Sequence, residues 1–247
     1  MNNRVFYIHG VGDAMEHAKD ILLRRGCRIL QEPQKEVTHV LLPVPTVETG
    51  TSLAAVLEKL PEDVTVFGGN MDTYLLEGRK VVDLLKDEDY LAENAAITAD
   101  CALRVAARHL PRVWKDCTVL ILGWGRIGKC LAKMLRELEA DVTVAARNPA
   151  HRSMAKALGF HAVDPEKLYF GLMRYRVIFN TVPHMLLPES LGSLCRTDCI
   201  KVDLASKPGI GGCGVIWARG LPGKYAPESS GELIARTVMR LACRKEG

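Results

Sequence analysis

Short apolar runs alternate with amphipathic stretches along the first part of the chain. RVFYIHG is rich in β-branched and aromatic residues, and the stretch from about Asp13 to Arg25 that follows it repeats apolar residues at helical spacing. The further runs CRIL, THVLLPV and VTVFGG are separated by turns or by the helical stretch LAAVLEKL. Strands that alternate with helices predict βαβ units and a largely parallel sheet. Residues 1–92 are therefore expected to form one small N-terminal α/β domain.

The same alternation resumes after a long helical stretch. AENAAITADCALRVAARHL is rich in alanine and other helix formers, and predicts a connecting helix over residues 93–112. Residues 113–225 are expected to form a second α/β domain, and residues 226–247 a closing amphipathic helix, with Ser229 or Ser230 as its N-terminal cap. The strands of the second domain are predicted near residues 118–122, 141–146, 177–180 and 200–204.

Three glycines follow the first strand of the second domain. Gly123, Gly125 and Gly128 have the G-x-G-x-x-G spacing, between the strand TVLIL and the helical stretch IGKCLAKMLREL. The first glycine permits a tight turn, the second lets a pyrophosphate approach the backbone, and the third lets helix and strand pack closely. The helix that starts near Arg126 and Ile127 directs its N–H groups and positive dipole end at the phosphates. This context predicts a doubly wound Rossmann dinucleotide-binding domain with a mostly parallel sheet; the alternative is a tight turn without a ligand.

The end of the next strand bears on the choice of cofactor. An acidic residue there would bind the ribose 2′-hydroxyl of NAD, but DVTVAARN ends with Arg147 and Asn148. An arginine can pair with a 2′-phosphate, so NADP is favoured over NAD. His151 and Arg152 either complete this anion pocket or are solvated residues of the next helix. FAD is disfavoured, because nothing later in the chain suggests an FAD domain.

Polar residues also follow the strand VIF in VIFNTVPHMLL. Ligands of doubly wound folds bind beyond the carboxyl ends of strands, so this segment is expected to lie at the nicotinamide. The residues expected there are Thr181, Val182 and Pro183. His184 is either a proton carrier or an ordinary loop histidine.

Two later loops are candidates for the substrate side of the site. KVDLASKPGIGG places Ser206 and Lys207 after a strand, and GLPGKYAP adds Lys224. Each lysine either binds a substrate carboxylate or is merely solvated. The candidates for a catalytic role are Ser206, Lys207 and His184, and none of them is assigned as a general base.

Composition excludes several classes of function. The chain has 247 residues, and its 33 basic and 29 acidic residues are interspersed and give a net charge of +4, without the basic stripe that nucleic-acid binding needs. No apolar run approaches the roughly 20 residues that span a bilayer. The eight cysteines lack zinc-ligand spacing, so no metal is expected. Without a recognisable signal peptide, they are expected to be reduced thiols in the cytoplasm.

Six motifs together resemble the A-subunit family of dipicolinate synthases. They are ENAAITAD, GRIGK, VTVAAR, IFNTVP, DLASKPG and GLPGKYAPESSGELIA, in this order. The resemblance implies an NADP-dependent oxidoreductase subunit that oxidises a dihydrodipicolinate-type dicarboxylate to dipicolinate during sporulation. It also implies a flavoprotein-like second subunit, an N-terminal domain on the substrate or partner side, and a cofactor in the cleft between two α/β domains. By this resemblance, Thr181, Val182 and Pro183 lie at the nicotinamide, and Ser206 and Lys207 at the substrate.

One segment departs from the family pattern. IGGCGVIWAR, residues 210–219, is shorter than the family's stretch before GLPG, where a helix is expected, and Trp217 and Arg219 replace a strand-like approach. This departure favours an alternative, an NADP-binding regulatory or assembly subunit without turnover. Another alternative is a shikimate-type or 2-hydroxyacid dehydrogenase, which needs a lysine–aspartate or histidine–acid pair in its cleft. The sequence leaves open whether copies of the chain form a homo-oligomer.

Overall fold

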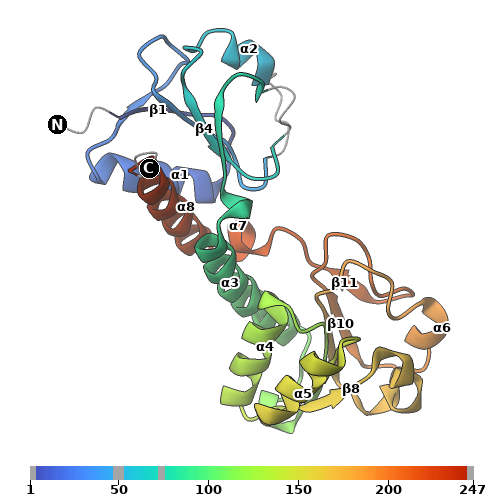
Figure 1. Cartoon of the computed structure of the whole chain (residues 1–247). Coiled ribbons are helices and arrows are strands. Elements are labelled where there is room, and N and C mark those ends of the chain that lie inside the picture. Colours follow the sequence, from blue (N-terminus) through green and yellow to red (C-terminus); the bar gives the residue numbers. More distant parts are fainter. Residues whose placement is uncertain (1–3, 47–52, 72–75, 244–247) are drawn as a thin grey trace. The chain divides into compact units, whose positions relative to one another are not determined.

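The chain folds into two compact units, each built on its own parallel sheet. The computed structural model describes residues 4–46, 53–71 and 76–243 (Figure 1). The first unit comprises Met1–Asn94 and Pro222–Gly247, and the second comprises Ala95–Leu221. The connecting helix expected over residues 93–112 is α3 and runs earlier, from Glu88 to Ala107, so that the first boundary falls within it.

The sheet of the first unit has five parallel strands in the order β2-β1-β3-β4-β5. Its order reverses between β1 and β3, as in a doubly wound fold. The edge strand β5 was not expected, because its two valines stand between charged residues and the strand is only partly buried. The elements are β1 (Val5–Ile8), α1 (Asp13–Arg24), β2 (Arg28–Leu30), β3 (His39–Leu41), α2 (Leu53–Leu57), β4 (Thr65–Gly68), β5 (Lys80–Asp83) and the 3-10 turn η2 (Leu84–Lys86).

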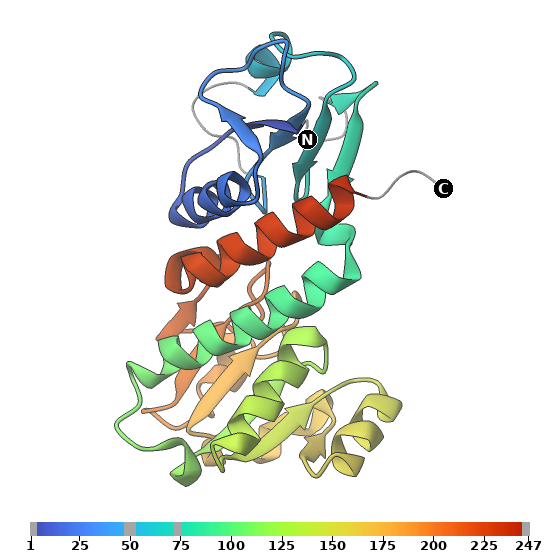
Figure 2. The same cartoon turned by 90° about the vertical axis from the view of Figure 1, so that its left-hand side faces the viewer.

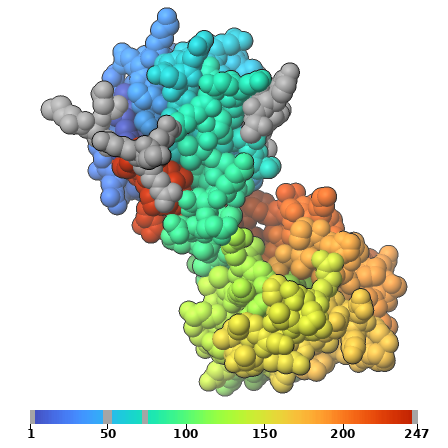
Figure 3. All heavy atoms as spheres, viewed as in Figure 1, coloured from blue at the N-terminus to red at the C-terminus, as the bar shows by residue number. Residues whose placement is uncertain are grey.

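The C-terminal helix α8 (Pro227–Ala242) belongs to this first unit and packs along α1. Figure 2 shows the two helices side by side, and in Figure 3 the red atoms of α8 lie beside blue atoms of the N-terminal segment. A Cβ on Gly231 would lie 2.5 Å from the carbonyl oxygen of Ala14 and 2.6 Å from the Cβ of His17. Only glycine therefore permits this close contact between α1 and α8. The contact joins the N-terminal and C-terminal parts of the chain in one unit.

The predicted serine cap of this helix is wrong. The helix begins at Pro227 after Ala226, whose side chain makes no capping hydrogen bond, and Ser230 is buried inside the first turns. Proline is well suited to the first helical position, because its missing N–H would have no intrahelical partner there. The start of α8 is thus determined by proline.

The second unit has the strand order of a Rossmann fold, which confirms the predicted fold class. Its six parallel strands lie in the order β11-β10-β9-β6-β7-β8, and the order reverses between β6 and β9. Helix α4 packs against β6 and β7, and α5 against β7 and β8. The elements are η3 (Trp114–Asp116), β6 (Thr118–Leu122), α4 (Arg126–Glu137), β7 (Asp141–Ala145), α5 (Pro149–Ala157), β8 (His161–Val163), η4 (Pro165–Phe170), η5 (Leu172–Arg174), β9 (Val177–Asn180), α6 (Glu189–Gly192), β10 (Ile200–Asp203), β11 (Val215–Trp217) and α7 (Leu221–Tyr225), which crosses the second boundary.

Two of these strands, β8 and β11, were not expected. Each has three residues, lies at a sheet edge and is partly exposed, so neither contains a long apolar run. Residues 210–219 were expected to contain no strand before GLPG, and this expectation is wrong because β11 lies there. Trp217 ends β11, and its indole Nε1 donates a hydrogen bond to the carbonyl of Ala205 at 3.2 Å.

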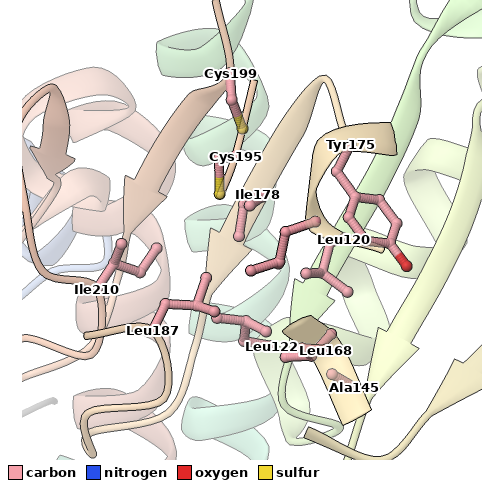
Figure 4. Close-up of a cluster of buried hydrophobic side chains, with 11 residues drawn as sticks. Leu120, Leu122, Ala145, Leu168, Tyr175, Ile178, Leu187, Cys195, Cys199 and Ile210 are labelled. Atoms are coloured by element: carbon pink, nitrogen blue, oxygen red, sulfur yellow. The ribbon is translucent and has the colours of Figure 1, made fainter. Parts of the chain in front are cut away.

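One face of this second sheet is covered by an apolar cluster that includes two cysteines. Figure 4 shows the sulfur atoms of Cys195 and Cys199 near one another in this cluster. All eight cysteines of the chain are free thiols. The buried members of the cluster are Leu120, Leu122, Ala145, Leu168, Leu172, Tyr175, Ile178, Leu187, Cys195, Cys199 and Ile210.

Among the described residues, no helix is long and apolar enough to cross a membrane.

Candidate functional site

The first glycine of the turn after β6 is required by two separate features of the structure. Gly123 has a φ of +106°, a backbone conformation that side chains strongly disfavour. A Cβ at this position would lie 2.4 Å from Oγ1 of Thr181 and 2.7 Å from Cγ2 of Val182. The turn after β6 and the loop after β9 are thus in contact, with no room for a side chain between them.

The other two glycines have opposite surroundings. A Cβ on Gly128 would lie 2.4 Å from the carbonyl oxygen of Gly123, so this residue lets α4 pack against the turn. A Cβ on Gly125 would meet nothing within 4 Å, and Gly125 is exposed at the start of α4. The three positions match the roles that the motif predicts: turn, open approach and helix packing.

The start of α4 provides hydrogen-bond donors to this open space. Gly125 is the N-terminal cap residue and has no side chain that could accept from the N–H groups of the first turn. There is no acidic residue in the first turn of the helix. A helix start with these properties attracts an anion, through its N–H groups and through the positive end of the helix dipole. The open side of Gly125 is therefore suited to a phosphate group.

The loop after β7 places one arginine in solvent and another in a structural role. Arg147 is exposed, and its side chain has no partner among the residues that the structure describes. Arg152 donates from Nη1 to the carbonyls of Ala146 and Arg147, both at 2.7 Å, and pairs with Asp164 at 2.9 Å. The guanidinium of Arg152 thus fixes the loop that carries Arg147.

Two further residues of this loop were expected to contact the anion. Asn148 caps α5, because its Oδ1 accepts from the N–H of Ala150 at 2.9 Å. His151 is exposed in the first turn of α5. Contact of Asn148, His151 or Arg152 with a cofactor stays a prediction, and Asn148 and Arg152 each have a local structural role besides.

A buried polar pair connects the ends of β9 and β10. Nδ2 of Asn180 donates to Oδ1 of Asp203 at 2.8 Å and to the carbonyl of Val182 at 3.0 Å. Oδ1 of Asn180 accepts from the N–H of Val182 at 3.1 Å. The two residues are register partners on neighbouring strands and are almost completely buried. Asn180 therefore fixes the first residues of the loop that contacts Gly123.

Asp203 fixes the loop after its own strand in the same way. Its carboxylate accepts from the N–H groups of Ala205 at 3.1 Å, Gly209 at 2.7 Å and Ile210 at 3.1 Å. With the amide of Asn180 this gives four donors for one buried carboxylate. Asp203 was missed by the sequence analysis, although an aspartate directly after IKV, at the end of a buried strand, was an available signal.

Glycine packing joins the two loops further. A Cβ on Gly209 would lie 2.2 Å from Nδ2 of Asn180 and 2.9 Å from the carbonyl oxygen of Val182. The carbonyl of Gly209 accepts from the N–H groups of Leu186 and Leu187 at 2.9 and 3.0 Å. The loops after β9 and β10 therefore form one hydrogen-bonded structure at the carboxyl edge of the sheet.

The predicted nicotinamide residues lie at this edge. Thr181 uses its N–H and its Oγ1 to donate to the carbonyl of Leu122, each at 2.9 Å. Val182 is half-buried beside Gly123, while Pro183 and His184 are exposed. His184 has no carboxylate partner within the described part of the chain.

The predicted substrate residues are only partly brought together. Ser206 and Lys207 are exposed in the loop that Asp203 organises. Lys224 lies in the helix α7, not in a loop, and from Pro222 onward the chain belongs to the first unit. GLPGKYAP was expected to be a loop, but residues 221–225 form the helix α7, and contact of Lys224 with a substrate stays a prediction.

Comparison with known proteins agrees with this geometry. Residues 81–186 match the family of NAD-binding domains of D-isomer specific 2-hydroxyacid dehydrogenases. The A-subunit of dipicolinate synthase from Bacillus subtilis (strain 168) is 26% identical over 241 residues, which cover 87% of this chain and 81% of that protein.

Solved structures show the same fold. The dipicolinate synthase A-subunit from Bacillus halodurans has a TM-score of 0.85 at 22% identity, over 98% of this chain and 99% of that one. The apo-structure of D-lactate dehydrogenase from Escherichia coli has a TM-score of 0.63 at 14% identity, over 97% and 96% of the two chains. The domain match supports a nicotinamide dinucleotide cofactor and a dehydrogenase-type role. The resemblance predicted from the motifs is confirmed: this chain is similar in sequence and in fold to dipicolinate synthase A-subunits.

Proposed function

We propose that the chain is an NADP-dependent dehydrogenase subunit that oxidises a dihydrodipicolinate-type ring to dipicolinate. One observation carries the proposal: the space at Gly125 is open, while Gly123 and Gly128 are both closed by backbone and side-chain contacts. A glycine stands where a phosphate would approach, in a chain similar to the dipicolinate synthase A-subunit. The reaction removes a hydride from a saturated ring carbon, releases a proton to water and leaves an aromatic pyridine ring.

Bound NADP⁺ would supply the hydride acceptor, and the chain's own residues would supply binding and orientation. The N–H groups at the start of α4 and the bare backbone of Gly125 would hold the pyrophosphate. Arg126 and Ile127 contribute the first N–H groups of that helix. Because the ring gains aromaticity, the step needs orientation of the ring and anchoring of its carboxylates more than a strong base.

The preference for NADP rests on Arg147. Arg147 is exposed after β7, and its side chain has no partner among the described residues. Arg152 holds the same loop through hydrogen bonds to two backbone carbonyls. No acidic side chain stands at the end of this strand, where one would repel a 2′-phosphate. Asn148 and Arg152 would border the same phosphate.

The other end of the cofactor would reach the loops after β9 and β10. Thr181, Val182 and Pro183 would line the nicotinamide, and Ser206 and Lys207 would bind a substrate carboxylate. The hydrogen bonds of Asn180 and Asp203 support this assignment, because they hold both loops in one arrangement. Lys224 is a further candidate for the substrate, and His184 for the released proton.

The wider setting follows from the relationship to the dipicolinate synthase A-subunit. We place the reaction in the cytoplasm of a sporulating cell. The partner there would be a flavoprotein-like second subunit, and the first unit would lie on the substrate or partner side. An NADP-binding regulatory subunit without turnover is the alternative that the experiment below separates.

A 2-hydroxyacid dehydrogenase is a second candidate, because the matched domain family is that of D-isomer specific 2-hydroxyacid dehydrogenases. Such an enzyme would use a histidine–acid pair at the nicotinamide. His184 has no carboxylate partner among the described residues, so the dipicolinate reaction is the better supported of the two.

A paired assay tests the proposed function. The purified chain is mixed with the candidate second subunit, hydroxy-tetrahydrodipicolinate and NADP⁺, and the absorbances of NADPH and dipicolinate are followed together. Both signals are expected to rise only when this chain is present, and neither with the Gly125→Val variant. NADP binding without either signal would instead favour the regulatory subunit or another substrate.

A further inference from the structure

A pocket lies at the edge of the Rossmann sheet opposite the glycine turn. It has a volume of about 580 Å³, and His161, the first residue of β8, stands in its wall. Because all six strands are parallel, the amino ends of β7 and β8 lie at the edge opposite the turn of Gly123. The pocket is thus separate from the site proposed for the dinucleotide, and its volume is that of a small-molecule site.

The charged side chains that line this pocket are all basic. They are Lys156 of α5, His161, Lys167 of η4 and Arg174 of η5. Asp141 stands beside them, 3.5 Å from His161 and 3.8 Å from Arg174, and neutralises part of the charge. Lys156 and Lys167 have no carboxylate partner among the residues that the structure describes. The pocket therefore has an excess of positive charge, which an anion would neutralise.

A buried hydroxyl without a partner stands in the same wall. Thr143 lies in the middle of β7, is 4% exposed and lines the pocket. Its Oγ1 has no hydrogen-bond partner among the described residues. Buried hydroxyls are normally satisfied, and an exception in a native fold calls for a ligand or a water molecule. This polar group is independent of the basic side chains, and it too points to a ligand.

Three aromatic rings also line the pocket, together with the aliphatic side chains of Ala162, Val163 and Leu168. Phe160, Phe170 and Tyr175 border the pocket, and Phe170 is 78% exposed. The ring of Phe170 packs on that of Tyr169, with centroids 3.8 Å apart, and the two form an exposed aromatic surface at the rim of the pocket. Flat rings stack or pack edge-on against aromatic side chains, so an aromatic body fits this lining better than a fully hydrated ion.

We infer that this pocket binds a small aromatic carboxylate. Its carboxylate groups pair with Lys167 and Arg174, its ring packs against Phe170, and its buried edge faces Thr143. The inference does not depend on the cofactor or on the reaction, because it rests on the amino edge of the sheet alone.

The test is an isothermal calorimetric titration of the whole chain with benzene-1,3-dicarboxylate at fixed ionic strength. The double variant Lys167→Gln/Arg174→Gln is expected to weaken binding by about tenfold or more, and Phe170→Ala by about threefold. Lys133→Gln, which removes an exposed cation of α4 outside the pocket, is the matched control and is expected to leave binding within about twofold. Circular dichroism checks that each variant is folded.

Competition experiments decide where the probe binds. Saturating NADPH is expected to leave the affinity of the chain for benzene-1,3-dicarboxylate unchanged. Nuclear Overhauser contacts are expected between the ring of this probe and Phe170. Inorganic phosphate is expected to compete poorly, because it lacks the ring. Displacement by NADPH, equal binding to the double variant, equal affinity for phosphate or no heat of binding would each overturn the inference.

Discussion

Nδ2 of Asn180 and Oδ1 of Asp203 are joined by a hydrogen bond of 2.8 Å between the last residues of two neighbouring strands. Their side chains are almost completely buried, with 0% and 1% of their surface exposed. Asn180 also binds both the N–H and the carbonyl of Val182, and Asp203 binds three N–H groups of the next loop. This pair therefore determines the shape of the edge where the dinucleotide and the substrate are proposed to meet.

Removal of the Asp203 carboxylate should destabilise the second unit strongly. Asp203→Ala leaves one N–H of the Asn180 amide, whose other N–H still donates to the carbonyl of Val182, and three backbone N–H groups without acceptors in a buried place. Each unsatisfied buried donor costs about 1–3 kcal/mol, so with four donors affected we expect a loss of at least about 4 kcal/mol in the free energy of unfolding. Urea unfolding measures it, with the exposed Asp63→Ala as the control. A loss no larger than that of the control would show that the network contributes nothing.

The glycine turn allows binding to be separated from folding. Gly125→Val places its side chain in open space, so the variant should fold with a stability within about 1 kcal/mol of the natural chain. It should nevertheless abolish binding of NADPH and NADH, because the side chain occupies the place of the pyrophosphate. Gly123→Val, which collides with Thr181 and Val182, should lose stability as well. Retained nucleotide binding in folded Gly125→Val would mean that the turn is only structural.

Arg147→Asp should change the cofactor preference. We expect NADPH binding to weaken by about tenfold or more, which is about 1.4 kcal/mol, with NADH binding unchanged or improved. The variant removes the cation proposed for the 2′-phosphate and introduces a carboxylate that repels it. Fluorescence titration with both nucleotides measures the change. An unaltered NADPH affinity would remove Arg147 from the phosphate site, and Arg104→Asp on α3 is a control outside that loop.

The first unit should lose stability in mild acid because of His39. Burial between strands, with Arg4 and Lys80 nearby, lowers the pKa of His39 to about 4 from the ordinary value of 6.5. The unfolded chain therefore takes up this proton near pH 6.5 and the folded chain only near pH 4. The contribution to stability is complete above about pH 6.5 and is lost as the pH falls towards 4.

At pH 5, after a discount for partial exposure, the expected loss from His39 is roughly 1 kcal/mol. Urea unfolding at pH 7 and pH 5 measures it, and His39→Gln should show a smaller difference between the two pH values. His151→Gln, which changes an exposed histidine of the other unit, should behave as the natural chain does. An equal pH effect in His39→Gln would assign the loss to other groups.

Local patterns in the sequence were enough for the fold class and for the turn. The apolar strand runs and the spacing of Gly123, Gly125 and Gly128 are read directly from neighbouring residues, and the structure gives each glycine the predicted surroundings. The strands β5, β8 and β11 were missed because they lie at sheet edges, where partial exposure removes the long apolar run.

Residue roles that depend on contacts across the sheet were harder to predict. Asp203 receives its partners from Asn180 on another strand and from N–H groups as far along as Ile210, which no local pattern reveals. The cofactor contact expected of Arg152 stays a prediction, but its hydrogen bonds to two loop carbonyls form only in the folded chain and were not predicted. Lys224 was expected in a loop, but it lies in the short helix α7, which contains a proline and a glycine and therefore has no helical signal in the sequence.

The most direct test of the proposed reaction follows a labelled hydrogen. The ring intermediate, deuterated at its saturated carbons, is oxidised by this chain and its second subunit with NADP⁺, and the recovered NADPH is examined by mass spectrometry. We predict one deuterium on the nicotinamide for each dipicolinate formed, while the second hydrogen leaves as a proton to water, and no transfer with Gly125→Val. Dipicolinate formed at full rate without deuterium in NADPH would contradict the account, because the electrons would then leave the ring by a route that does not pass through this chain.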